Sequence, residues 1–64
     1  MDLKEQIVYL LKEKNGSMKI GEISDELNIK PIEVLTNINK IPLNIIEREL
    51  DSDGDITGIK YRKA

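Results

Sequence analysis

The stretch that decides the fold of this chain covers residues 20–34 and reads IGEISDELNIKPIEV. Its first half repeats apolar side chains at the spacing of one helix face. Asn28 tolerates the left-handed backbone conformation in which helices often end, and Pro31 suits the first turn of a new helix. The stretch therefore predicts two helices joined by a tight turn, which is the helix-turn-helix arrangement.

Residues 2–14 predict a further helix upstream of this pair, because apolar residues recur there at helical spacing. Asp2 is suited to cap the start of that helix, and Asn15 followed by glycine is suited to stop it. The short segment 17–19 has room for no more than a β-bridge. We expect the second helix to span about residues 20–27.

The third helix is predicted over about residues 31–41. Val34, Ile38 and Ile41 recur there on one face, which is expected to meet the core. Pro42 is expected to stop the helix, because proline cannot donate a backbone hydrogen bond.

Beyond the third helix the pattern changes to the alternation typical of strands. Two strands are predicted, over residues 43–50 and 56–62, with a wing covering about residues 43–62 in total. Asp53 followed by glycine, between β-forming residues, is a strong signal for a hairpin.

The second strand has an apolar side and a basic side. Ile59 and Tyr61 are expected to point into the core, and Lys60 and Arg62 are expected to point to solvent. Together, residues 1–64 predict a single α+β domain that is mostly α. Its expected layout is a three-helix winged helix-turn-helix with a C-terminal two-stranded β-hairpin wing.

Composition narrows the classes of function. The 64 residues include no cysteine and no histidine, which excludes disulfides, thiolate metal sites and catalysis by Ser-His or Cys-His pairs. We expect no enzymatic activity, no cofactor and no bound metal. No apolar run approaches the roughly 18 residues of a membrane span, and no secretion signal is recognisable. A cytoplasmic protein is the expectation.

The chain resembles the winged helix-turn-helix domains of MarR-, ArsR- and Lrp-like bacterial and archaeal regulators. The resemblance rests on residues 20–34, where Ser24 stands at the usual small residue and Asn28 at the usual glycine, and on residues 45–49. Two positions depart from the pattern. Lys30 replaces the usual serine or threonine before proline, and the wing tip is acidic where such regulators carry arginine or lysine.

This resemblance implies a double-stranded DNA-binding protein, expected to be a transcriptional regulator or a nucleic-acid-associated accessory factor. Thr36 and Asn39 lie on the outer side of the predicted third helix, where they would reach base edges. Phosphate contacts are expected from the basic residues Lys19, Lys30, Lys40, Arg48, Lys60 and Arg62.

The alternative is a winged-helix module that binds protein and not DNA. The net charge is −2, and the third helix has no arginine for the commonest contact to guanine. Ile32 is expected to be exposed and Leu35 at least half exposed, which is typical of a protein-contact patch. The other interpretation packs both side chains against the wing or the N-terminus.

Two smaller features have two interpretations each. Asp51, Asp53 and Asp55 are good turn formers; as a cation site they would lack the spacing and closing glutamate of an EF-hand. Tyr9 falls off the apolar face of the first helix, and its neighbour Val8 lies at the edge of that face. They are either partly exposed side chains or the contact patch of a homodimer.

Overall fold

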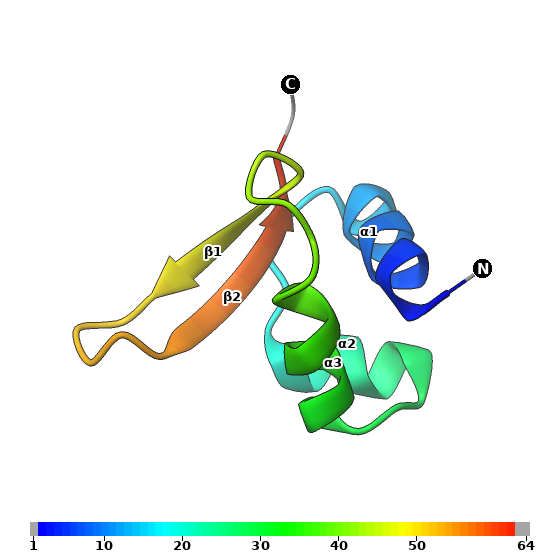
Figure 1. Ribbon diagram of the computed structural model, residues 1–64, viewed down its shortest axis with the longest axis horizontal. Helices are drawn as coiled ribbons and strands as arrows, with labels where there is room; N and C mark the ends of the chain where they lie inside the picture. The colour runs from blue at the N-terminus through cyan, green and yellow to red at the C-terminus, as the bar shows by residue number, and fades with distance from the viewer. Residues whose placement is uncertain (1, 63–64) are drawn as a thin grey trace.

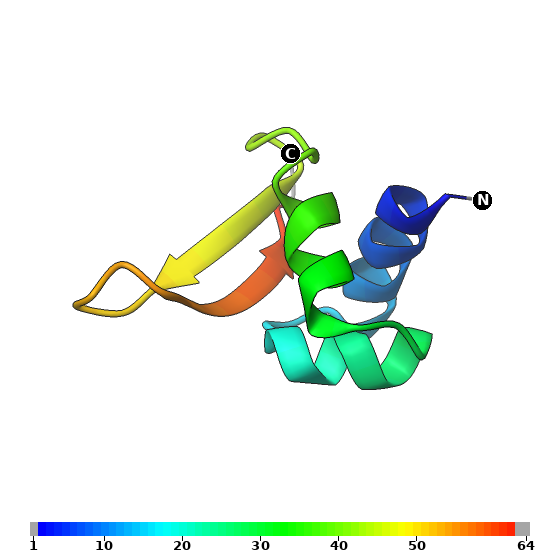
Figure 2. The same ribbon diagram turned by 60° about the horizontal axis from the view of Figure 1, so that its bottom comes forward.

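Three helices precede a two-stranded antiparallel hairpin in the computed structural model, which describes residues 2–62 (Figure 1). The elements are α1 (Leu3–Lys14), α2 (Ile20–Leu27), α3 (Pro31–Ile38), β1 (Ile46–Leu50) and β2 (Ile56–Tyr61). This is a mostly helical α+β fold with the layout of a winged helix-turn-helix, as the sequence predicts. The tip of the hairpin extends away from the three helices in both views (Figures 1 and 2).

The first two helices begin and end at the residues that the sequence marks. A carboxylate oxygen of Asp2 accepts the backbone N–H of Glu5 at 2.9 Å, which caps the start of α1. Asn15 and Asn28 follow α1 and α2 with φ angles of 51° and 55°. Both therefore adopt the left-handed conformation that asparagine tolerates better than most residues.

The turn between α2 and α3 is held by a buried serine. Ser24 is buried on α2, and its hydroxyl donates a hydrogen bond to the carbonyl of Ile29. The backbone N–H of Ile29 donates in return to the carbonyl of Ser24 at 3.1 Å. Because a buried hydroxyl needs a partner, this exchange both satisfies Ser24 and fixes the angle at which the chain enters α3.

The hairpin is joined to the helices through β2. Met18 forms a β-bridge with Ile59, in which each residue donates its N–H to the other's carbonyl at 2.8 Å. The bridge lies in the segment 17–19, which the sequence predicts to be too short for more than this. Gly58 lies beside this bridge, where a Cβ atom would fall 2.4 Å from the hydroxyl of Ser17. That hydroxyl donates to the carboxylate of Glu49 across the strand. Glycine is therefore the residue that allows this close approach.

The core is aliphatic and every element contributes to it. Figure 2 shows α1, α2 and α3 gathered on one side of the hairpin. The buried apolar residues are Ile7, Leu11, Met18, Ile23, Val34, Ile38, Ile41, Ile46 and Ile59. Ile59 is fully buried and Tyr61 packs against this core, so the inward side of β2 is as predicted.

The segment between α3 and β1 differs from the prediction. The helix ends at Ile38 and not at Ile41, because the backbone tightens into turns: the N–H of Ile41 donates to the carbonyl of Ile38 at 3.1 Å. The first strand begins at Ile46 and not at residue 43. Pro42 accepts a turn hydrogen bond from Ile45 at 3.0 Å, which leaves Leu43 67% exposed.

Candidate nucleic-acid interface

The two residues expected to read bases lie on α3 and directly after it. Thr36 is exposed on the side of α3 opposite the buried Val34. Asn39 is also exposed, but it follows the helix and does not lie within it as predicted, because α3 ends at Ile38. The hydroxyl of Thr36 donates to the carbonyl of Ile32 at 2.8 Å. Its oxygen remains an acceptor, while the amide of Asn39 offers both a donor and an acceptor. The pair can therefore make hydrogen bonds to base edges.

Three lysines surround the ends of α2 and α3. Lys19 immediately precedes α2, Lys30 immediately precedes α3, and Lys40 lies in the turn after α3. All three are exposed, and within residues 2–62 none of them forms an ion pair. Lys40 also lines a groove beside α1. Lys30 and Lys40 therefore flank α3 at its two ends, and Lys19 lies at the start of α2.

The N-terminus of each of these helices is already occupied by a glutamate. The carboxylate of Glu22 accepts the backbone N–H of Lys19 at 2.8 Å, and that of Glu33 accepts the N–H of Lys30 at 3.2 Å. These are the backward contacts of a capping box, and they satisfy the N–H groups of the two lysines that precede the helices. A phosphate that approaches either helix would meet the adjacent lysine ammonium group.

Two basic residues of the hairpin are paired with one acid. The ammonium of Lys60 lies 3.0 Å from one carboxylate oxygen of Glu47, and the guanidinium of Arg62 lies 3.7 Å from the other. The hydrogen bond and charge of Lys60, with a smaller effect of Arg62, hold the pKa of Glu47 below its ordinary value. Lys60 and Arg62 point to solvent as predicted, but their charge is partly neutralised.

The side chain of Arg48 makes its contact within the protein, between the hairpin and α3. It lies opposite Ile59 in the strand register, on the same side of the hairpin as the buried Ile46. Its Nη2 donates to the carbonyl of Ile38 at 2.7 Å, which caps the C-terminus of α3. Its Nε is buried and has no hydrogen-bond partner among residues 2–62. The alternation of side chains from Ile46 is the signal that places Arg48 inward. We therefore leave Arg48 out of the candidate interface.

The expected apolar patch on α3 is smaller than predicted. Ile32 is 64% exposed, in agreement with the sequence. Leu35 is partly buried and not half exposed. It lies about a quarter turn from the core-facing residues of α3, at the border between the buried side and the exposed side of the helix.

No protein-family model, curated protein or solved structure matches this chain. Within residues 2–62, none of the three helices has the length and apolar composition needed to cross a membrane.

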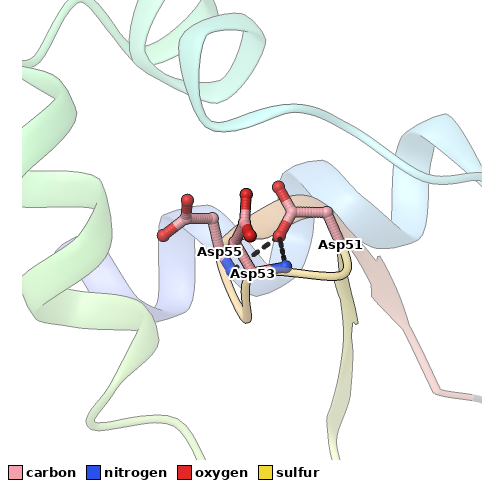
Figure 3. A group of neighbouring side chains, drawn as sticks. All are labelled: Asp51, Asp53 and Asp55. Atoms are coloured by element: carbon pink, nitrogen blue, oxygen red, sulfur yellow. Dashed lines mark hydrogen bonds between the residues drawn. The ribbon is translucent and has the colours of Figure 1, made fainter.

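The acidic wing tip is organised by one of its three aspartates. A single carboxylate oxygen of Asp51 accepts the backbone N–H of Asp53 at 2.9 Å and of Asp55 at 3.0 Å. Gly54 completes the turn with a φ of 85°. Figure 3 shows the three carboxylates on the same side of the loop, and their oxygens lie within 4.8 Å of one another. The turn accounts for Asp51, and exposed acidic groups alone do not establish a metal site.

Proposed function

We propose that this protein binds double-stranded DNA through the outer side of α3. One observation carries the proposal: Thr36 is exposed on α3 and Asn39 directly after it, while lysines that form no ion pair within residues 2–62 lie at both ends of that helix. A helix that follows a tight helix–helix turn is the element that enters the major groove in helix-turn-helix proteins. The biological role proposed is that of a transcriptional regulator or a nucleic-acid-associated accessory factor.

Each side chain has a distinct part in this proposal. Asn39 is suited to adenine, which offers one donor and one acceptor in the major groove. Thr36 donates its hydroxyl proton to Ile32, so it accepts a hydrogen bond at a neighbouring base. Lys19, Lys30 and Lys40 neutralise phosphates and supply the affinity that does not depend on sequence. Three such contacts predict a plot of log affinity against log salt concentration with a slope of about −3.

The wing contributes less than the helices. Glu47 competes with phosphate for Lys60 and Arg62, and the exposed carboxylates at residues 51, 53 and 55 repel it. The hairpin therefore approaches the DNA through its strands, with its acidic tip held away from the phosphates.

Titration of a fluorescently labelled random-sequence duplex tests the proposal. Anisotropy is followed at several salt concentrations for the wild type and for Lys30→Ala. Loss of one phosphate contact is expected to reduce the magnitude of the salt slope by about 0.9. Lys4→Ala is the control, because it removes the same charge from α1.

Two results would overturn the proposal. The first is no binding by the wild type at low salt. The second is an equal loss from Lys4→Ala and Lys30→Ala, which would show general charge attraction and no defined interface.

A second candidate function is a protein-interaction module. It is favoured by Ile32, which is 64% exposed on the same side of α3. The proposed partner is a basic or amphipathic segment, in keeping with the net charge of −2. Affinity capture with the wild type and with Ile32→Asp tests it. A partner retained equally by both forms would exclude Ile32 as the contact.

A further inference from the structure

The side of α1 that faces away from the core carries a stripe of three exposed residues. Glu5, Tyr9 and Lys12 are spaced by four and three positions, which places them on one helix face. Ile7 and Leu11, the buried residues of α1, lie on the other side. Tyr9 is 56% exposed, although it is one of only two aromatic residues in the chain.

Tyr9 stands at an open groove with apolar walls. The groove runs between α1 and the segment after α3, and its apolar side chains include Val8, Pro42 and Ile45. Figures 1 and 2 place α1 at the edge of the molecule, with α2 and α3 on one side of it only. An exposed tyrosine beside such a groove is typical of a surface that meets another protein.

The charges along this stripe are arranged to match a second copy of the same helix. Glu5 lies near the start of α1 and Lys12 near its end, so the midpoint between them falls between Val8 and Tyr9. When two such helices run antiparallel about that midpoint, Glu5 of each copy lies level with Lys12 of the other. Tyr9 of each copy then lies level with Val8 of the other.

We propose that the protein forms a twofold symmetric homodimer in which α1 packs antiparallel against α1 of a second copy. The same contacts occur twice, as a symmetric interface requires. Two Glu5–Lys12 ion pairs flank a centre made by Tyr9 and Val8, and the opposed helix dipoles add attraction. This assembly does not depend on the DNA-binding proposal, because the stripe lies on α1 and not on α3.

One contact within the monomer competes with the interface. The ammonium of Lys12 lies 5.1 Å from the centre of the Tyr61 ring. An exposed cation–π contact of this kind is weak, and Lys12 itself is exposed. Its flexible side chain can turn from the ring to a carboxylate on the second copy without any movement of the backbone.

Charge reversal at the two ends of the stripe tests the pairing. Sedimentation equilibrium is measured up to millimolar concentration for the wild type, Glu5→Lys and Lys12→Glu. Each single reversal turns two attractive contacts into repulsive ones and is expected to weaken the dimer about tenfold or more. An equimolar mixture of the two variants is expected to associate as a heterodimer. In one contact the lysine introduced at position 5 faces the glutamate introduced at position 12, and in the other the unchanged Lys12 faces the unchanged Glu5.

The combined variant Glu5→Lys/Lys12→Glu is the decisive member of the set. It restores both ion pairs with reversed polarity and keeps the net charge, so its dimer affinity is expected to return to within about threefold of the wild type. The combined variant also carries any loss of helix stability that the two substitutions cause. A recovered dimer affinity therefore cannot result from a more stable helix. Circular dichroism checks that each variant is folded.

Asp25→Lys on α2 is the matched control, because it is exposed and changes the charge by the same amount as Glu5→Lys. It is expected to leave the dimer unchanged. A wild type that stays monomeric throughout would overturn the proposal. So would single reversals that match the control, or a combined variant no better than the single ones.

Discussion

The helix-turn-helix and the hairpin each hold three basic residues and place them in different surroundings. Lys19, Lys30 and Lys40 in the first region are exposed and form no ion pair within residues 2–62. In the hairpin, Lys60 and Arg62 share Glu47, and Arg48 caps α3. The two regions therefore differ in how much positive charge they offer to a partner, although their numbers of basic residues are equal.

Strand register and helix capping explain the difference. Glu47 lies directly opposite Lys60 in the antiparallel pair, where side chains come within contact distance. On the helices, Glu22 and Glu33 bind the backbone N–H groups of Lys19 and Lys30. Their carboxylates therefore accept backbone hydrogen bonds, and within residues 2–62 the ammonium groups of the two lysines form no ion pair. An acidic residue near a lysine or arginine reduces the positive charge offered to a partner only when its carboxylate lies against the basic side chain.

The largest expected effect tests whether the two regions are energetically separate. Ile59 is fully buried and bridges to Met18, so Ile59→Ala removes packing from both regions. It is expected to lower the free energy of unfolding by about 3 kcal/mol. Urea unfolding followed by circular dichroism and by tyrosine fluorescence should give one shared transition. Two separate transitions would show that the hairpin and the helices unfold independently; Ile32→Ala, at an exposed site, is the control.

The next largest effect is expected from a comparison of two basic residues of the hairpin, Arg48 and Lys60. Arg48→Ala removes the hydrogen bond to the carbonyl of Ile38 and is expected to destabilise the fold by about 2 kcal/mol. Lys60→Ala removes only an exposed ion pair, for which the expected loss is below about 1 kcal/mol. Urea unfolding of both variants measures the difference. Equal losses would contradict a structural role for Arg48.

A smaller effect concerns the turn of the helix-turn-helix. Asn28 has a φ of 55°, which alanine adopts with strain, so Asn28→Ala is expected to lower stability by about 1 kcal/mol. Asn28→Gly removes the same side chain without that strain. It should therefore be clearly more stable than the alanine variant. If thermal unfolding shows the two variants to be equal, backbone conformation is not what asparagine supplies there.

Removing the carboxylate of Glu47 should leave the hairpin with basic side chains that are free to contact phosphate, as the helix-turn-helix has. Glu47→Gln frees Lys60 and Arg62, so DNA affinity is expected to rise and the salt slope to steepen by up to about 2. The duplex titration described above measures both. Glu13→Gln, which removes an exposed acid from α1, controls for net charge. An unchanged slope would place the hairpin outside the interface.

The smallest effect is the contribution of Glu47 to acid stability. Its folded pKa is lowered by Lys60 and Arg62 from an ordinary value of about 4.5. The stability that it contributes is present above pH 4.5 and is lost as the pH falls through the folded pKa. Glu47→Gln should therefore show a shallower loss of unfolding free energy below about pH 4.5. Urea unfolding at pH 3 to 7 checks this, and identical profiles would contradict it.

Much of the fold could be predicted because its signals are local. Asp2, Asn15 and Asn28 mark helix ends through their own side-chain and backbone preferences. The alternation in β2 placed Ile59 and Tyr61 inward. The same alternation, applied from Ile46, would also have placed Arg48 inward. Its positive charge suggested a phosphate contact instead.

The segment from residue 39 to 45 could not be predicted in the same way. Periodicity places Ile41 on the buried face of α3, and Ile41 is indeed buried, but it reaches the core from a turn. Burial constrains where a side chain lies and leaves open which backbone conformation brings it there. The backbone conformation of this segment depends on how the chain passes from α3 to β1, and the spacing of apolar residues carries no information about that path.

The sequence by itself determined three helices, a hairpin and the exposed side of the third helix, and it limited residues 17–19 to no more than a bridge. Caps and periodicity decide these features because they act over a few residues. Only the tertiary structure decided which charges are free. Glu47, Lys60 and Arg62 meet through strand register, and Arg48 meets Ile38 through the packing of the hairpin on α3. Coulomb attraction and hydrogen bonding act over a few ångströms in space, so their outcome depends on distances that exist only after folding.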